Sequence, residues 1–272
     1  MSQNNLKLGV IGAGFVGGSV INGFDKNVDM FVVDTKLHPE NTIDQLIEFK
    51  PTITFICVPT PKAIGDSGDV DVSIVRQVLS DLHDRRYSGI AVIKSTITPK
   101  HLTKMKKDFG LKIVYNPEFL TEANAHKDFL NPNMQVLGGK WRDCDTVEKA
   151  YNRHSSVKVV PTFKVDLITA SLIKYTINSW LATKVTFFNE LHELHEASGS
   201  MSDWESFTEM LSNDPRMGNT HMQVPGPDGK KGFGGHCFPK DTEAFLHYAN
   251  KKNTELSVLK KAVSKNNKTK GQ

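Results

Sequence analysis

A cysteine with charged neighbours stands in a glycine-rich stretch toward the end of the 272-residue sequence. The stretch reads GFGGHCFPKD over residues 232–241, so that Lys240 and Asp241 follow Cys237 within one helical turn. The thiolate is the nucleophilic form of cysteine, and a nearby cation, or a helix N-terminus beginning near Pro239, lowers the pKa of a thiol. The preceding glycines allow the chain to approach a ligand closely. This pattern favours a catalytic cysteine over a buried structural one.

The two other cysteines lack such a setting. Cys57 lies in an apolar stretch that reads as a strand, and Cys144 lies in the polar stretch WRDCDT. Most free cysteines are buried structural residues, and we assign that role to Cys57. Three scattered cysteines form neither a disulfide framework nor a zinc site, so we expect no metal and a reducing cytoplasm.

The start of the sequence suggests an oxidant. The apolar run from Leu6 to Ile11 leads into a G-x-G-x-x-G spacing and a helix-compatible stretch. The first glycine permits a tight turn, the second lets a pyrophosphate approach the backbone, and the third lets helix and strand pack closely. Amides at the helix N-terminus then face the phosphates. The predicted dinucleotide contacts in this loop are Gly12, Gly14, Phe15, Val16 and Gly17.

A carboxylate at the end of the next apolar stretch decides which dinucleotide is expected. Asp34 stands 22 residues beyond Gly12, at the end of MFVVD. A carboxylate there accepts hydrogen bonds from a ribose diol and repels a 2′-phosphate, which predicts NAD rather than NADP. The alternative is an ordinary turn residue after a strand.

Strands and helices alternate through the first half of the chain. Apolar stretches at 52–58, 90–96 and 112–120 read as further strands with polar helical stretches between them. Such alternation predicts a parallel sheet with right-handed crossovers, in which ligands bind beyond the carboxyl ends of the strands. We therefore predict an α/β fold with a Rossmann-like, doubly wound parallel sheet over residues 1–162. The residues that fall at such ends include Pro59, Thr60, Ser95, Thr96, Asn116, Pro117 and Glu118.

The second half begins with one long helix. Residues 165–197 contain no glycine or proline, and a helix of about 30 residues would be roughly 45 Å long. Lys174 and Asn178 are four apart and share a face of it, although an exposed helix can carry such residues without function. We expect residues 163–272 to hold this long central helix, which is a connector or dimer element, and a small helical region with the cysteine loop.

Two polar stretches of the second half are expected to be solvated. The histidines of HELHE (192–196) are three apart, whereas a zinc protease helix places them four apart, so a solvated polar face is favoured. The basic stretch KKAVSKNNKTKGQ at the end is expected to be a frayed, solvated terminus.

Composition excludes some classes of function. The chain is 38% hydrophobic and 24% charged, as in ordinary globular proteins, and no stretch reaches the roughly 18 to 20 apolar residues of a membrane span. The net charge of +4 is too small to imply nucleic acid, but it is compatible with anionic small molecules.

With these motifs in order, the chain resembles the nucleotide-sugar 6-dehydrogenases of the UDP-glucose/GDP-mannose dehydrogenase family. The similarity runs in family order from residue 8 to about residue 248, and the segment that ends in CFPKD is the most specific. It is more similar to the UDP-glucose branch than to the others. The matching segments are GVIGAGFVG, CVPTP, KSTITP, NPEFLTEANAHKDF, IKYTINSWLATKVTFFNEL and DPRMGNTHMQVPGPDGKKGFGGHCFPKD.

The resemblance implies a four-electron oxidation of UDP-glucose to UDP-glucuronate with two NAD, and a role in polysaccharide biosynthesis. Cys237 would attack the C6 aldehyde to form a thiohemiacetal that becomes a thioester, and Lys174 and Asn178 would hold the oxyanion. Asp241 would act as a base, while Glu118 and Thr96 would position or activate the hydrolytic water. The further cofactor contacts implied are Val58, Pro59, Thr60, Ser95, Thr96, Glu122 and Lys240. The implied substrate contacts are Phe119, Leu120, Lys174, Asn178, Phe233, Gly234 and Gly235.

The resemblance also leaves alternatives open. Family members normally continue into a second Rossmann-like domain that grips the nucleotide, whereas this sequence stops near its start, so we expect a separate chain to supply it or a loss of substrate affinity. The chain would then be an active dehydrogenase or an NAD-binding protein without catalysis. In either case we expect a homodimer through the central helix. A 3-hydroxyacid-type dehydrogenase, which needs no thiol and oxidises its substrate once, is the third alternative.

Overall fold

The computed structural model describes residues 5–65, 68–121 and 124–271. By its internal contacts the chain divides into two compact units. The first comprises Met1–Lys62 and Val70–Lys174, and the second comprises Ala63–Asp69 and Tyr175–Gln272. The boundary between them falls within one continuous helix, and each unit is described by itself.

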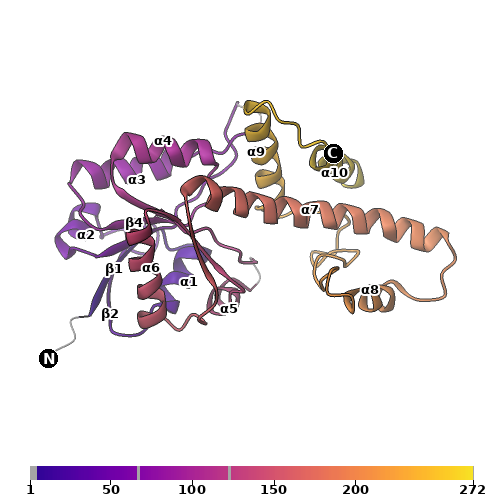
Figure 1. The fold of residues 1–272 in the computed structure, drawn as a ribbon, viewed down its shortest axis with the longest axis horizontal. Helices are drawn as coiled ribbons and strands as arrows, with labels where there is room; N and C mark the ends of the chain where they lie inside the picture. Colours follow the sequence, from indigo (N-terminus) through magenta and orange to yellow (C-terminus); the bar gives the residue numbers. More distant parts are fainter. Residues whose placement is uncertain (1–4, 66–67, 122–123, 272) are drawn as a thin grey trace. The chain divides into compact units, whose positions relative to one another are not determined.

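Seven strands of the described residues form one sheet in the first unit, in the order β2-β1-β3-β4-β5-β6-β7. Figure 1 shows this sheet with its flanking helices. The strand order reverses between β1 and β3, which is where an open α/β sheet leaves a crevice at the carboxyl ends of its strands. The strands are β1 (Leu6–Ile11), β2 (Val28–Val33), β3 (Ile53–Ile56), β4 (Ile90–Ile93), β5 (Lys112–Tyr115), β6 (Gln135–Gly139) and β7 (Thr162–Val165).

Helices cover both faces of this sheet, which confirms the predicted doubly wound α/β class. Helices α2, α3 and α4 pack against one another on one face, while α1, α5 and α6 cover the other (Figure 1). They are α1 (Phe15–Gly23), α2 (Ile43–Phe49), α3 (Ser73–Asp84), α4 (Pro99–Phe109), α5 (Ala125–Leu130) and α6 (Trp141–His154). The α1 face holds a core in which the ring of Tyr151 packs 4.9 Å from that of Phe24.

One strand pair departs from the predicted parallel sheet. Strands β5 and β6 are antiparallel, whereas the other neighbouring pairs are parallel. Within its described residues, the connection between them contains a single helix, the six-residue α5, about 9 Å long. A parallel return needs a crossover that carries the chain back along the sheet, usually on a longer helix. The chain therefore enters β6 near the end of β5 and runs the other way.

The predicted long helix is present as α7 (Leu167–Ala197), 31 residues that cross from the first unit into the second. Asp166 sits before its first turn, where its carboxylate accepts hydrogen bonds from the amides of Ile168 and Thr169 at 2.8 and 2.9 Å. These bonds satisfy amides that have no partner within the helix. A glycine at position 199 follows its end, as expected for a helix terminus.

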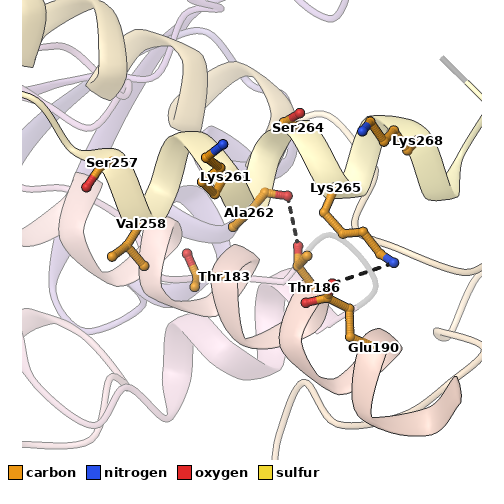
Figure 2. Close-up of a pocket in the computed structure, with 10 residues that line it drawn as sticks. All are labelled: Thr183, Thr186, Glu190, Ser257, Val258, Lys261, Ala262, Ser264, Lys265 and Lys268. Atoms are coloured by element: carbon orange, nitrogen blue, oxygen red, sulfur yellow. Dashed lines mark hydrogen bonds and ion pairs between the residues drawn. The ribbon is translucent and has the colours of Figure 1, made fainter. Parts of the chain in front are cut away.

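The second unit adds α8 (Trp204–Ser212), α9 (Phe238–Lys251) and α10 (Ser257–Thr269) to its part of α7. Helix α10 shows that the expectation of a frayed terminus was wrong. Its residues Leu259, Ala262 and Asn266 are buried, because they recur at helical spacing on the face that packs on the unit. Figure 2 shows α10 beside α7, where the Thr186 hydroxyl donates to the carbonyl of Ala262 at 3.4 Å.

The HELHE stretch is solvated only in part, since Glu193, Leu194 and Glu196 are exposed but the two histidines are half-buried. The rings of His192 and His195 pack edge-on against Trp204 of α8, with centroids 4.8 and 5.5 Å apart. The histidines thus serve as aromatic packing surface between α7 and α8. Among the described residues no group of three or more histidine, cysteine or acidic side chains is placed to hold a metal.

Candidate active site

The glycine loop of the first unit lies between β1 and α1, as predicted. Gly12 has φ +87°, a conformation that only glycine adopts without strain, and a Cβ there would lie 2.9 Å from the carbonyl of Cys57. A Cβ on Gly17 would lie 1.9 Å from the Gly12 carbonyl oxygen. A Cβ on Gly14 would meet no atom within 4 Å. The first and third glycines therefore permit close packing, and the second leaves open space.

The start of α1 can receive an anion. Gly14 is the N-cap and supplies no side-chain cap to the first amides of the helix, Phe15 to Gly17. These amides have no partner inside an α-helix, and the helix dipole adds positive potential. Phe15 is 71% exposed and Val16 is partly buried, and the backbone amides of both belong to the first turn of α1.

Asp34 follows β2 directly and is tied to the glycine loop. Its carboxylate accepts hydrogen bonds from the amides of Ala13, Lys36 and Leu37 at 2.8 to 2.9 Å. These bonds, that from Ala13 foremost, hold the pKa of Asp34 below its ordinary value, so it is ionised at neutral pH. Asp34 is thus a turn residue as well as a carboxylate beside the loop, and its two oxygens retain acceptor capacity for a ribose.

The loops after β3 and β4 are joined by side-chain hydrogen bonds. The hydroxyl of Ser95 donates to the carbonyl of Val58 at 2.6 Å, and the hydroxyl of Thr60 donates to the carbonyl of Thr96 at 3.0 Å. Val58 and Thr60 are buried, whereas Pro59 between them is exposed. The predicted residues at these two strand ends therefore form one connected edge.

Glu118 lies at the end of β5 and is held from two sides. Its carboxylate forms an ion pair with Lys94, and its main-chain carbonyl accepts a hydrogen bond of 2.5 Å from Lys174 Nζ. The same ammonium lies 5.3 Å from the centre of the Phe119 ring. Leu120 packs against the hydrophobic core instead of projecting from the surface. Glu122, a predicted cofactor contact, lies outside the described residues.

Lys94 is the residue of this cluster that the sequence did not reveal. It follows β4 and is only 3% exposed. The sequence signal for its burial is its place directly after the apolar run IAVI, where a strand is still buried. Its burial and its partners depend on β5 and α6, which are distant in the sequence.

In the second unit Cys237 is exposed and is the N-cap of α9. The helix N-terminus predicted near Pro239 is confirmed, since α9 begins at Phe238 with the proline in its first turn. The positive end of the helix dipole favours the thiolate form of a cysteine placed there. The thiol is thus not walled off from solvent, as its proposed chemistry requires.

Asp241 lies one turn into α9 and is 1% exposed. Its carboxylate accepts a hydrogen bond from the Asn178 amide of α7 at 2.6 Å and another from Lys240 Nζ at 2.6 Å. Three of the predicted residues of the second unit are thereby brought into direct contact. These two partners fix the orientation of the carboxylate, and a carboxylate in a fixed orientation can accept a proton.

Two buried asparagines fix the glycine loop that precedes Cys237. The side chain of Asn266 accepts from the Phe233 amide at 2.6 Å and donates to the Phe233 carbonyl at 3.2 Å. The Gly232 amide donates to Asn189 on α7 at 2.9 Å. Phe233 itself is buried, so any substrate contact from this loop comes through Gly234, Gly235 and the backbone. Neither asparagine was predicted as a site residue.

The other two cysteines are unreactive by their surroundings. Burial raises the pKa of the Cys57 thiol to about 12, and burial together with the charge of Asp143 raises the pKa of Cys144 to about 11. Neither thiol forms an appreciable amount of thiolate at neutral pH. This supports the structural role assigned to Cys57 and leaves Cys237 as the reactive candidate.

The second unit also carries a groove of about 710 Å³ between α7 and α10 (Figure 2). It is lined by hydroxyls and by Lys261, Lys265 and Lys268 of α10, and Lys265 pairs with Glu190 at 3.5 Å. None of the predicted site residues lines it.

Among the described helices, none is long and apolar enough to cross a lipid bilayer.

The first unit fits a dinucleotide by three observations of its own geometry. The glycine loop approaches Cys57 too closely for a side chain at Gly12, the space beside Gly14 is open, and the ionised Asp34 stands at the end of the neighbouring strand. Gly12, Gly14 and the first amides of α1 would hold the pyrophosphate, and Asp34 would hold a ribose.

Comparison with known proteins agrees with both units. Residues 32–155 match the model of the NAD-binding domain of the UDP-glucose/GDP-mannose dehydrogenase family, and residues 168–268 match the model of its central domain. The UDP-glucose 6-dehydrogenase of Rickettsia bellii is 37% identical over 224 residues, which are 79% of this chain and 48% of that protein. The chain spans about half the length of the curated relatives it matches first.

Two solved structures share the fold. A UDP-glucose dehydrogenase from Pyrobaculum islandicum superimposes with a TM-score of 0.78 at 24% identity, covering 97% of this chain and 68% of the other. A UDP-D-ManNAc dehydrogenase from Pyrococcus horikoshii gives a TM-score of 0.75 at 19% identity, covering 97% and 69%. The two family models together account for most of the chain, its NAD-binding domain included: the protein belongs to the UDP-glucose/GDP-mannose dehydrogenase family.

Proposed function

We propose that this chain carries the catalytic groups for oxidation of a nucleotide sugar, UDP-glucose, to the corresponding uronate through a covalent bond to Cys237. The observation that carries the proposal is the exposed cysteine at the N-terminus of α9, one turn before the buried Asp241. An alcohol can be oxidised to an aldehyde without a thiol. A thiol explains how the aldehyde reaches the oxidation level of an acid.

We assign residues 1–162 as the NAD-binding domain and residues 163–272 as the domain of the long helix and the cysteine loop. Bound NAD⁺ supplies the oxidising power, since two NAD⁺ take up two hydrides while R–CH₂OH and water become R–COO⁻ and three protons. The glycine loop and Asp34 would bind and orient it. The polar edge formed by Val58, Thr60 and Ser95 would close the site on the side of β3 and β4.

Cys237 would act at the aldehyde level. Its thiolate sulfur adds to C6, the carbonyl electron pair moves to oxygen, and a thiohemiacetal forms. Asn178 and Lys174 are buried amide and ammonium donors of the kind that stabilise such an oxygen. In this structure they donate to Asp241 and to the Glu118 carbonyl, so both would exchange these internal partners for substrate oxygen.

Asp241 would take the proton of the C6 hydroxyl, and Lys240 would stabilise the ionised carboxylate. After the second oxidation the sulfur holds C6 as a thioester. Water positioned by Thr96 then adds to C6 and gives a proton to the Glu118 carboxylate, the carbon–sulfur bond breaks, and the thiolate leaves. The products are the uronate and the regenerated thiolate.

A cofactor-reduction assay tests the proposal. The purified chain is supplied with NAD⁺ and UDP-glucose, GDP-mannose or UDP-N-acetylmannosamine. It is assayed alone and mixed with a second chain that corresponds to the part of the relatives' sequence that this chain does not cover. We expect UDP-glucose to give two NADH per molecule consumed. One NADH per substrate would indicate an alcohol dehydrogenase of the hydroxyacid type. Binding of NAD⁺ with no reduction by any sugar nucleotide would overturn the proposal in favour of a non-catalytic NAD-binding protein.

We also propose that two copies pair through α7. Trp180, Phe187 and Leu194 are 63%, 55% and 61% exposed and follow one another at seven-residue spacing. Such spacing places three large apolar side chains along one stripe of a helix, the pattern by which helices pair. Light scattering should give twice the 30.3 kDa of one chain. A monomer mass at micromolar concentration would exclude the pairing.

A further inference from the structure

A buried ammonium group lies beneath Glu118. Lys94 Nζ donates to the side-chain carbonyl of Asn116 at 2.7 Å and to the hydroxyl of Tyr151 at 3.1 Å, and it forms the ion pair with the Glu118 carboxylate. The three partners come from the end of β5 and from α6, and all belong to the first unit. The three N–H groups of the ammonium are thereby matched with three acceptors.

Burying the Lys94 ammonium is unfavourable in free energy unless the Glu118 carboxylate compensates its charge. Burying an ammonium costs several kcal/mol per ion unless a charged partner and hydrogen bonds compensate. Burial lowers the pKa of Lys94 to about 7. The ion pair with the Glu118 carboxylate favours the charged form of the ammonium, because an opposite charge at this distance stabilises it. Among the described residues, the other titratable groups that face Lys94 are the Cys57 thiol, whose raised pKa keeps it neutral, and the Tyr151 phenol, whose pKa burial raises well above its ordinary value. Glu118 is therefore the anion of the cluster.

The cluster is also held in place by bonds beyond Lys94. The Asn116 amide nitrogen donates to the carbonyl of Val136 on β6 at 3.0 Å, and the Tyr151 hydroxyl donates to Asn116 Oδ1 at 2.8 Å. From the other side, Lys174 Nζ donates to the Glu118 main-chain carbonyl. The side chain of Glu118 is 15% exposed, whereas the side chain of Lys94, which holds it, is 1% exposed. One end of the ion pair is thus accessible while the other is fixed.

We propose that Lys94 is a positioning residue that holds the Glu118 carboxylate ionised and oriented to accept a proton from the water that hydrolyses the Cys237 thioester. The inference rests on the proposed function and adds a residue that none of its steps used. Lys94 makes no contact with substrate in this role. It acts through Glu118.

The effect should appear in the hydrolytic step alone. In Lys94→Met the carboxylate loses its counter-charge, so it takes up a proton or turns away, and we expect hydrolysis of the acyl-enzyme to slow about 100-fold, the scale of a lost general base. Single-turnover mixing with UDP-glucose and NAD⁺, followed by acid quench and mass measurement of the intact protein, would show the acyl adduct accumulating. Wild-type decay of the adduct in Lys94→Met would overturn the inference.

The pH profile and two further variants separate positioning from structural damage. Hydrolysis in the wild type should fall as pH rises above about 7, because Lys94 then loses its proton and its charge. Lys94→Arg keeps its charge at all these pH values and should restore hydrolysis at high pH. Tyr87→Phe removes a buried hydroxyl that pairs with Thr54 in the same sheet, so it controls for lost stability and should leave the adduct short-lived.

A measurement that needs no activity completes the test. The ¹³Cε signal of Lys94 in the free protein reports its titration, and Glu118→Gln should lower the midpoint by at least about one pH unit because the stabilising anion is gone. An unchanged midpoint would overturn the coupling. If the wild type never produces NADH from UDP-glucose, the proposed function fails by that result, whereas the titration still decides whether Lys94 and Glu118 act as a pair.

Discussion

Cys237→Ala is expected to abolish uronate formation, with a loss of about 10⁴-fold or more, while the protein stays folded and still binds NAD. The thiol is needed only after an aldehyde has formed, and alanine cannot form a covalent adduct. Removal of a nucleophile that acts within a catalytic set costs this much in enzymes where it has been measured. The side chain is exposed at the N-cap of α9, so its loss leaves no cavity.

Chromatographic assay for UDP-glucuronate is the direct measurement. Hydroxylamine in the same mixture traps a released aldehyde, so a product that carries an oxime would show that the first oxidation survives in the variant. Cys144→Ala is the matched control, because it makes the same chemical change at a fully buried thiol in α6 whose pKa is raised to about 11. It should lower stability by about 1–2 kcal/mol and leave the uronate yield unchanged.

Persistent uronate formation by Cys237→Ala would show that the aldehyde hydrate, not a thiohemiacetal, is the species oxidised. Asp241 and Asn178 would then act on the aldehyde hydrate and not on a thiohemiacetal. Their contact at 2.6 Å in the second unit would remain, but as a structural bond between α9 and α7.

The elements that the sequence predicted well are those with a single strong signal. Helix α7 starts within two residues of the predicted position because 31 residues lack glycine and proline and Asp166 caps the first turn. Strands β1 and β3 to β5 are short apolar runs between polar stretches. Strands β6 and β7 were not predicted, since QVLGG carries two glycines and TFKV is a partly exposed edge strand.

The residues that escaped prediction are those whose environment is built from distant parts of the chain. Lys94 meets Tyr151 across 57 positions, and Asn266 meets Phe233 across 33. Composition made the end of the chain read as a charged tail, whereas Leu259, Ala262 and Asn266 lie at the spacing of one helix face. The types and spacing of residues gave the candidate nucleophile and the dinucleotide loop. Burial, which decides what a lysine or an asparagine does, came only with the fold.

Gly17→Ala is the second change with a large expected effect, because the added methyl has nowhere to go. Its Cβ would lie 1.9 Å from the Gly12 carbonyl oxygen and 2.8 Å from the carbonyl carbon, and both are main-chain atoms that cannot rotate away. Relief requires that the glycine loop and the start of α1 separate. That movement displaces the amides that would hold the pyrophosphate, so NAD affinity should fall by at least about 100-fold.

Gly18→Ala is the matched control in the same helix. A Cβ there meets only the Ala13 carbonyl oxygen at 3.7 Å, an ordinary contact, and alanine favours a helix interior by about 0.5–1 kcal/mol over glycine. Urea denaturation should therefore show Gly18→Ala as stable as the wild type or more so, and Gly17→Ala less stable by about 1–3 kcal/mol, the usual cost of overpacking. Calorimetric titration with NAD⁺, at a temperature where all three proteins are folded, separates affinity from stability. Wild-type affinity in Gly17→Ala would mean that close approach of the loop to α1 is not what binds the cofactor, and the assignment of Gly12 to Gly17 as its cradle would fall.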